Sequence, residues 1–342
     1  MNTKRIVFTE PCKAELLDVE IGALEADEVL TKIEVSTISS GTERALISGD
    51  PNINYTDFHP KVVFPRHSGY SSAGVVVEVG SAVTSVKPGD RVALSWSSHS
   101  NYCKLKESNV HKIVADSISF EEAALCHIVT FPLAAIRKCR LEVGESAIVM
   151  GLGILGMFAV KLLRAAGAVP IIAVDPVAHK REEALASGAD YALDPFDPNF
   201  AKTVKELTDG GAKVGIEVTG IGAGLDGILD CMAHFGRVAL LGCTRNANFN
   251  IDYYRKVHGP GITLVGAHTV ARPKVESSAA YWTTHDDMMA VMRMIAAGRL
   301  SIREMIDETL SPTECGAAYT RLVTEKFFPL VQFNWNRLEG AK

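Results

Sequence analysis

Three glycines and one aspartate have the types and the spacing that dinucleotide binding needs. Gly151, Gly153 and Gly156 form a G-x-G-x-x-G run directly after the apolar residues 147–150, and Asp175 follows nineteen residues later. The first glycine permits a tight turn, the second lets the backbone approach a pyrophosphate, and the third allows close packing of a helix on a strand. A helix N-terminus can then hold the pyrophosphate, and a carboxylate can accept both ribose hydroxyls of an adenosine. The pattern predicts a dinucleotide site; the alternative is a βαβ unit without a ligand.

The elements around this run have the periods of a parallel α/β sheet. Residues 147–150 and 171–174 have the length of buried parallel strands, and the helix between them should end near Gly167. Its predicted buried side chains are Leu155, Phe158, Ala159, Leu162 and Leu163. Further strands are predicted at 191–193, 214–218, 237–241 and 263–265, and further helices at 180–187, 200–207 and 224–233. We therefore expect a doubly wound sheet with the dinucleotide at its switch point.

The first 124 residues have the period of β-strands. Residues 29–35 alternate between apolar and polar side chains, and residues 73–79 are rich in valine. Pro88-Gly89-Asp90 marks a turn into a further strand. Short strands at close spacing indicate a compact barrel or sandwich.

Three later segments complete the prediction. Residues 120–139 should be helical with an interruption at Pro132, and residues 286–297 should form a helix with one apolar face, in which methionines fill the core. The apolar segment 327–333 reads as a strand that returns to the N-terminal domain. The expected domains are residues 1–124, 125–268 and 269–342, the last being the return to the first.

Length and composition exclude several classes of protein. A chain of 342 residues with 47% hydrophobic and 22% charged residues is typical of a soluble globular protein of two domains. The net charge of −5 argues against nucleic acid as a partner. Seven scattered cysteines without a C-x-x-C pair favour reduced thiols in the cytoplasm. The longest apolar run, 147–160, is too short to span a bilayer, and the N-terminus lacks the apolar core of a signal peptide. The expected partner is a small-molecule substrate.

Further motifs connect the two halves of the chain to a known superfamily. They are SSGTE (39–43), GYSSAG (69–74), VKPGDRV (86–92), SFEEAA (119–124), IEVTG (216–220) and GRVALLG (236–242). With these the chain resembles the medium-chain dehydrogenase/reductase superfamily, which includes zinc alcohol and polyol dehydrogenases and quinone reductases. The SGTER run is locally similar to the branch that contains bacteriochlorophyllide hydroxyethyl dehydrogenase.

The resemblance implies a fold and a cofactor. The fold is α/β, with a GroES-like β-barrel that holds the substrate, a Rossmann nucleotide-binding domain and a C-terminal return to the barrel. The cofactor is NAD(H), and the assembly is a homodimer or homotetramer. The implied cofactor contacts are Gly151, Gly153, Ile154, Leu155, Gly156, Asp175, Lys180, Thr219 and Gly242.

The zinc-ligand positions of the family are altered. Ser40 stands where zinc-dependent members have a cysteine, Tyr70 stands where they have a histidine, and Cys126 occupies the third position. Zinc needs three N, S or carboxylate donors and an open position, so this set is poor. We predict a zinc-free protein; the alternative is a different metal site that Cys126 shares with His127 or His67.

The resemblance leaves four side chains to handle one proton and one developing oxyanion. Thr42 stands at the family's proton-relay hydroxyl, Tyr70 should donate to a carbonyl, Ser40 could add a second hydrogen bond, and His127 could shuttle the proton. Each also has a structural interpretation. Thr42 could cap a helix that starts at Glu43, Tyr70 could be a packed aromatic, and His127 could be a buried structural histidine.

Three functions stay open at this point. They are an NAD-dependent dehydrogenase of a secondary alcohol, sugar or cyclitol; a zinc-free carbonyl, quinone or enoyl reductase; and a non-catalytic dinucleotide-binding sensor. Asp175 favours NAD over NADP and hence the first function, although Lys180 and Arg181 lie close by in the sequence. Trp96, Trp282 and the cluster 283–287 could line a substrate cleft or belong to the core.

Overall fold

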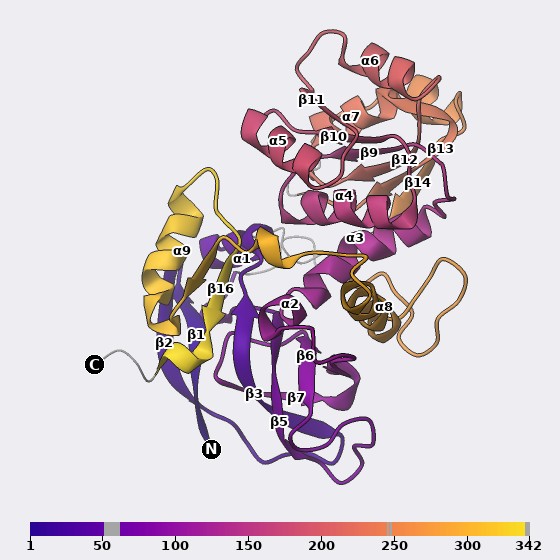
Figure 1. Cartoon of the computed structure of the whole chain (residues 1–342). Helices are drawn as coiled ribbons and strands as arrows, with labels where there is room; N and C mark the ends of the chain where they lie inside the picture. The colour runs from indigo at the N-terminus through magenta and orange to yellow at the C-terminus, as the bar shows by residue number, and fades with distance from the viewer. Residues whose placement is uncertain (51–61, 245, 247, 339–342) are drawn as a thin grey trace. The chain divides into compact units, whose positions relative to one another are not determined.

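The computed structural model describes residues 1–50, 62–244, 246 and 248–338. The chain divides into two compact units (Figure 1). The first unit consists of Met1–Ile128 and Met288–Lys342, and the second of Val129–Asp287.

The second unit is built on six parallel strands in the order β11-β10-β9-β12-β13-β14. Their bounds are β9 (Ala147–Met150), β10 (Ile171–Val174), β11 (Tyr191–Leu193), β12 (Ala212–Glu217), β13 (Met232–Leu240) and β14 (Thr263–Gly266). The strand order reverses between β9 and β12, which is where a doubly wound sheet opens its ligand crevice. The predicted sheet is confirmed.

The helices of the second unit follow the strands as the sequence predicts, with two corrections. They are α4 (Ile154–Ala166), α5 (Ala178–Ala186), α6 (Phe200–Leu207) and α7 (Gly222–Asp230), and α4 and α7 lie on opposite faces of the sheet (Figure 1). Helix α4 ends at Gly167, which is left-handed with φ 85°, and of its predicted buried residues Leu155 is half-buried instead. The expected extension of α7 to Ala233 is wrong, because Met232 already pairs with Ala212 and starts β13.

The predicted interruption at Pro132 is also wrong. Helix α2 (Phe120–Ala123) ends before Ala124, and α3 (Cys126–Lys138) continues through Pro132. Proline removes one helical N–H and costs stability inside a helix, but tertiary packing can override that preference. The flanking residues Ile128, Val129, Ala135 and Ile136 are buried. The break lies at the turn 124–125.

The first unit holds a curved sheet in the order β15-β16-β3-β5-β6-β8, with β7 paired to β3, and a small sheet in the order β2-β1-β4. The strands are β1 (Asn2–Glu10), β2 (Lys13–Glu20), β3 (Glu28–Thr37), β4 (Arg66–His67), β5 (Ser71–Val79), β6 (Arg91–Ser95), β7 (Tyr102–Lys106), β8 (Val110–Lys112), β15 (Glu308–Leu310) and β16 (Val331–Asn334). Helix α1 (Ser40–Ser48) follows β3. The short helices of both units are η2 (Glu107–Asn109), η3 (Tyr254–His258), η4 (Arg303–Met305), η5 (Pro312–Glu314) and η6 (Trp335–Leu338).

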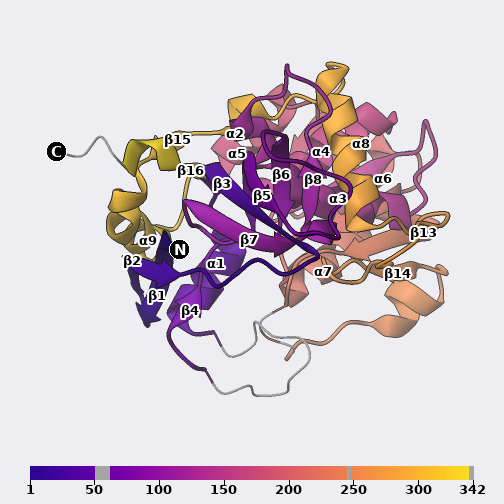
Figure 2. The same cartoon turned by 90° about the horizontal axis from the view of Figure 1, so that it is seen from below.

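The C-terminal segment completes the first unit. Strand β16 lies beside β3 and pairs with it antiparallel (Figure 2). It starts at Val331 and not at Phe327, which is 43% exposed; Pro329 lies between them and has no N–H to give to a ladder. Helix α9 (Cys315–Thr324) packs on β2 and places Tyr319 edge-on against Phe8. Helix α8 (Thr284–Ala296) buries Met288 and Met292, as predicted for core residues.

Helices of the described ranges are all too short or too polar to cross a membrane.

The helix–turn contact at Gly156 yields a stability prediction. A Cβ atom on Gly156 would lie 1.9 Å from the carbonyl oxygen of Gly151, whereas one on Gly227 of α7 would meet its nearest neighbour, Met150, at 3.7 Å. We expect Gly156→Ala to lower the free energy of unfolding by about 1–3 kcal/mol or more through overpacking. Gly227→Ala should raise it by up to ~1 kcal/mol through helix propensity. Urea unfolding of both variants tests this, and equal effects would contradict the close helix–turn contact.

Candidate functional site

Two hydroxyl groups meet in the first unit. The phenol of Tyr70 donates a hydrogen bond to the Ser39 hydroxyl, and both side chains are buried. Tyr70 directly precedes β5 and follows Gly69, whose φ of 78° makes the turn that presents it. Ser39 is the N-cap residue of α1. Paired hydroxyls can donate to a carbonyl or alkoxide oxygen, provided that their geometry is fixed in advance.

Two further rings surround the Tyr70 ring. His127 lies edge-on to it at 5.7 Å between centroids, and Trp96 lies 6.0 Å from Tyr70 and 4.9 Å from His127. Trp96 has φ 59° and is 41% exposed. A left-handed backbone at a bulky residue is a strained conformation of the kind that clusters at functional sites.

The tautomer of His127 follows from its partner. Its Nδ1 lies 2.9 Å from the carbonyl oxygen of Tyr70, which can only accept, so Nδ1 carries the hydrogen and Nε2 is the basic nitrogen of the neutral ring. His127 is 1% exposed. The structure thus brings two predicted site residues, Tyr70 and His127, into contact.

The other two predicted residues, Ser40 and Thr42, lie half-buried in the first turn of α1. The interpretation of Thr42 as the cap of a helix starting at Glu43 is wrong, since the helix begins at Ser40 and its N-cap residue is Ser39. Sequence reasoning missed Ser39. The available signal was its position beside Ser40 in the SSGTE run.

The glycine turn of the second unit has the predicted shape. Gly151 is left-handed with φ 97°, and Gly156 packs on its carbonyl. A Cβ on Gly153 would meet no atom of the described residues within 4 Å, so the backbone at the start of α4 is open to a ligand. Ile154 and Leu155 form the first turn of that helix and are half-buried. Backbone N–H groups in this position suit a pyrophosphate.

Asp175 ties the end of β10 to the glycine turn. Its Oδ2 accepts from the N–H of Leu152 and its Oδ1 from the N–H of Val177, each at 2.9 Å. Each carboxylate oxygen keeps a second lone pair that could accept from a ribose hydroxyl. Arg181 donates to the Asp175 carbonyl at 2.7 Å, and Lys180 lies half-buried beside it on α5.

The predicted contacts Thr219 and Gly242 lie in two neighbouring turns, Thr219 after β12 and Gly242 after β13. The Thr219 hydroxyl donates to the carboxyl of Glu217, and burial raises the pKa of that carboxyl. A Cβ on Gly242 would lie 2.3 Å from the nitrogen of Gly220, so the two glycines pack against each other. Both turns lie at the carboxyl end of the sheet, where this fold binds ligands.

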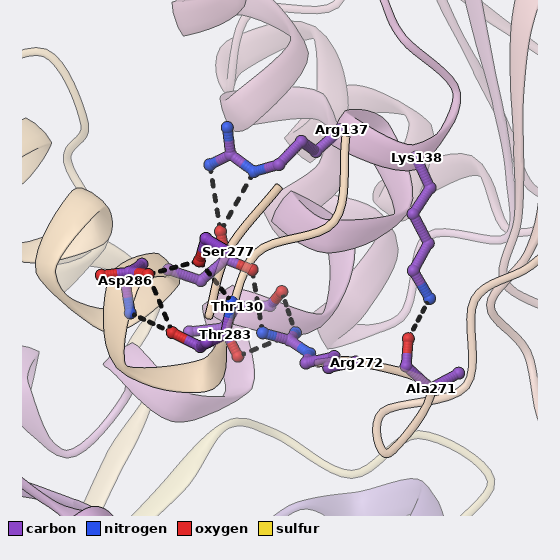
Figure 3. A network of polar contacts seen from close by, with 9 residues as sticks. Thr130, Arg137, Lys138, Ala271, Arg272, Ser277, Thr283 and Asp286 are labelled. Carbon is purple, nitrogen blue, oxygen red and sulfur yellow. Dashed lines mark hydrogen bonds and ion pairs between the residues drawn. The ribbon is translucent and has the colours of Figure 1, made fainter. Parts of the chain in front are cut away.

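The segment around Trp282 forms a polar network that supports the loop after β14 (Figure 3). Trp282 stacks on the Arg137 guanidinium at 3.5 Å, and Arg137 and Arg272 pair with opposite oxygens of the fully buried Asp287 at 3.0 and 2.9 Å. Thr283 accepts from the N–H of Asp286 at 3.1 Å and so caps α8. Through these contacts Trp282, Thr283 and Asp287 join α8 to α3 and to the loop after β14.

The donors that are present do not fit a zinc site. Burial raises the pKa of the Cys126 thiol well above its ordinary range, which disfavours the thiolate that binds zinc, and Sγ donates to the Glu122 carbonyl at 3.4 Å. The side chain of His67 on β4 is exposed for the most part. Loss of part of its hydration lowers the pKa of its imidazole. Within the described ranges, no three His, Cys, Asp or Glu side chains gather as a metal site requires.

Two family models match the chain. The model of the alcohol dehydrogenase GroES-like domain matches residues 25–139, and the zinc-binding dehydrogenase model matches residues 155–283.

Three similar proteins illustrate the range of relatives. The D-guloside 3-dehydrogenase of Escherichia coli K12 is 26% identical over 94% of this chain and 96% of its own. A short chain alcohol dehydrogenase of Escherichia coli CFT073, solved with NADH, has a TM-score of 0.82 at 17% identity and covers 98% of this chain and 99% of its own. A quinone oxidoreductase of Pseudomonas syringae has a TM-score of 0.78 at 25% identity and covers 97% and 99%.

Proposed function

This chain belongs to the zinc-type alcohol dehydrogenase-like group of the medium-chain dehydrogenase/reductase superfamily, and on that premise we propose that it is an NAD(H)-dependent oxidoreductase that acts on a secondary alcohol or ketone without catalytic zinc. Relatives named as dehydrogenases support the oxidoreductase class, and a neighbour solved with NADH supports a nicotinamide cofactor.

The observation that carries the proposal is the hydrogen bond from Tyr70 to Ser39. In carbonyl reduction, hydride adds to the carbon and the oxygen becomes negative, so a donor must face that oxygen. In the reverse direction the hydroxyl proton must leave as the carbon gives up hydride. Because the phenol donates its one hydrogen to Ser39, the Ser39 hydroxyl keeps its own hydrogen for the substrate oxygen, and the phenol can replace that hydrogen once it is given up; in the reverse direction both transfers run backwards. The nicotinamide supplies or accepts the hydride.

His127 suits a role in moving that proton onward. Its ring contacts the Tyr70 ring, and its Nε2 is the basic nitrogen in the neutral form. An imidazole with one protonated and one basic nitrogen can take up a proton at one atom and release one at the other.

A sugar or cyclitol-like substrate is supported by two observations. The D-guloside 3-dehydrogenase relative oxidises, by its name, a sugar derivative at a ring carbon. Trp96 is 41% exposed beside Tyr70, and a large aromatic surface next to a hydroxyl donor suits a ring with an apolar face and polar edges.

A zinc-free quinone or carbonyl reductase is the second candidate. The quinone oxidoreductase of Pseudomonas syringae, at 25% identity over nearly the whole chain, favours it. Screening distinguishes the two functions, because the first oxidises polyols or sugars with NAD and the second consumes reduced cofactor with quinones.

The donor set generates a metal prediction. We expect protein purified without chelator to contain well under one zinc per chain, because Cys126 is buried as a thiol and Ser40 and Tyr70 are weak ligands. Turnover should survive treatment with a chelator. Elemental analysis and an assay after dialysis against a chelator check both statements, and stoichiometric zinc held by Cys126 and a histidine would overturn them.

Asp175 generates a prediction of cofactor choice. Its carboxylate would repel a 2′-phosphate at about 4 Å by roughly 4 kcal/mol at an effective dielectric near 20, which is about a thousandfold preference for NAD. Lys180 and Arg181 should reduce this figure. Asp175→Ser and the shape-preserving Asp175→Asn should both reduce the difference between the affinities for NAD and NADP, mainly by improving NADP binding. Calorimetry that gives equal wild-type affinities would mean that the basic pair reads the ribose.

The hydroxyl pair generates a prediction of turnover. Tyr70→Phe should lower kcat by two to three orders of magnitude, or about 2.7–4 kcal/mol, because one preorganised donor is lost. Ser39→Ala and Thr42→Val should also lower kcat, and Ser40→Ala should lower kcat by a smaller factor. Affinity for NAD should stay unchanged, since these residues belong to the other unit.

The control for this prediction is Tyr102→Phe, which removes a phenol from β7 in the same unit. A substrate is found by screening polyols, sugars and ketones for an absorbance change of the nicotinamide. Normal turnover of Tyr70→Phe would transfer the donor role to His127. Tight NAD binding without any substrate would favour a sensor.

A further inference from the structure

We propose that Glu43 and His99 are positioning residues that hold the Ser39 hydroxyl and the Tyr70 phenol within hydrogen-bonding distance of each other. This inference rests on the proposed function of that pair. Neither residue belongs to the hydroxyl pair, and both are fully buried beneath it.

The Glu43 carboxylate gathers three donors from separate segments. Its Oε1 accepts from the N–H of Ser39 at 2.8 Å, its Oε2 lies 3.1 Å from Nε2 of His99, and the phenol of Tyr319 donates to the same oxygen. A buried carboxylate needs such partners, because its charge is otherwise costly. Glu43 therefore fixes the peptide of Ser39 to the core of the unit.

The contact between Glu43 and Ser39 changes what the serine can do. An N-cap serine ordinarily accepts from a backbone N–H in the first turn of its own helix. Ser39 makes no such side-chain bond in α1, and its hydroxyl accepts from Tyr70 instead. The backbone N–H of Ser39 therefore donates to Glu43, and the Ser39 hydroxyl accepts from the Tyr70 phenol and not from its own helix.

His99 connects this helix start to the turn that carries Tyr70. The His99 ring lies against Gly69, where a Cβ would come within 2.7 Å of Cδ2 of His99. The backbone N–H of His99 donates to the Ser68 carbonyl at 3.0 Å. Gly69 immediately precedes Tyr70 in the chain. One imidazole therefore touches the segments on both sides of the hydroxyl pair.

The C-terminal segment locks this imidazole in place. Nδ1 of His99 lies 2.7 Å from the Ser36 hydroxyl, which accepts from the Trp335 indole at 2.9 Å. Tyr319 completes the carboxylate shell from α9. Burial and the Glu43 charge raise the pKa of Tyr319 well above its ordinary value, so its phenol remains a donor.

A purely structural role would produce a different result from a positioning role. Removing a hydrogen-bond partner from a buried carboxylate lowers stability in either case. A positioning role additionally moves the Tyr70 phenol, which stability measurements do not detect. The test therefore needs a signal from Tyr70 itself and a control that is equally buried.

His111 provides the matched control. It is fully buried in the same unit, and its Nε2 lies 3.0 Å from the Ser95 hydroxyl. We compare His99→Gln, Glu43→Gln and His111→Gln in protein with ¹³Cζ-labelled tyrosine. The Tyr70 resonance is assigned by its loss in Tyr70→Phe. We expect it to shift in the first two variants and to stay in place in His111→Gln.

Turnover should change in parallel with that resonance. We expect His99→Gln and Glu43→Gln to lower kcat about tenfold to a hundredfold, since a displacement of about 1 Å can cost that much, with the KM for NAD unchanged. His111→Gln should keep its kcat. If Glu43→Gln or His99→Gln fails to fold, Tyr319→Phe removes a single donor to Glu43 and should shift the Tyr70 resonance in the same sense.

Each outcome supports or overturns the inference. An unchanged Tyr70 resonance in His99→Gln, or an equal change in His111→Gln, overturns it and leaves a structural role. If the wild type turns over no substrate, the proposed function fails, while the resonances still decide whether Glu43 and His99 position the phenol.

Discussion

The buried charge of Glu43 constrains the whole first unit. A carboxylate without solvent must find its donors within the fold, and the donors here come from α1, from the loop that carries His99 and from α9. Residue 319 is far from residue 43 in the chain, so the C-terminal return is needed before this carboxylate is satisfied. The return is therefore more than an added strand: the C-terminal segment pairs β16 with β3 and also supplies, from α9, a hydrogen-bond donor to the carboxylate beneath the hydroxyl pair.

The second unit uses a carboxylate in a comparable way. Asp175 accepts from the backbone of two adjacent loops, at Leu152 after β9 and at Val177 after β10. Glu217 holds the turn after β12 through Thr219 and Gly220. In each case an acid at the carboxyl end of a strand fixes the turn that follows. The N–H groups that remain at the start of α4 are thereby held in place for an anionic ligand.

Local patterns predicted much of this fold. Period and spacing predicted the features that depend on neighbouring residues alone. These are the glycine run, the apolar runs of β9 and β10 and the end of α4 at Gly167. Predictions failed where tertiary contacts outweigh local preference. Helix α3 continues through Pro132 in a buried setting, and α7 yields to a strand that pairs at Met232.

The site was predictable in part for the same reason. Tyr70 and His127 were identified through the family motifs, and the structure brings their rings together. Ser39 was missed because its partner depends on which of two adjacent serines is the N-cap residue and which is the first residue of the helix. The pairing of Glu43 with His99 spans 56 residues, and no spacing rule connects two such positions before the sheet is folded.

A site that relies on hydroxyl donors depends more on positioning than one that relies on a metal ion. The attraction of a cation for an oxyanion falls only as the inverse of distance, whereas a hydrogen bond weakens steeply outside about 2.7–3.2 Å and below about 120°. A phenol must therefore be oriented as well as placed, whereas a spherical cation such as Zn²⁺ attracts an oxyanion from any direction. Under the proposed function, this requirement explains the buried shell around Ser39 and Tyr70: Glu43 fixes one backbone segment, His99 packs against the other, and Ser36 and Trp335 contact the imidazole between them. In the proposed zinc-free site, rigidity has to come from the protein, and a buried carboxylate with its hydrogen bonds made is one of the stiffest supports that a fold can supply.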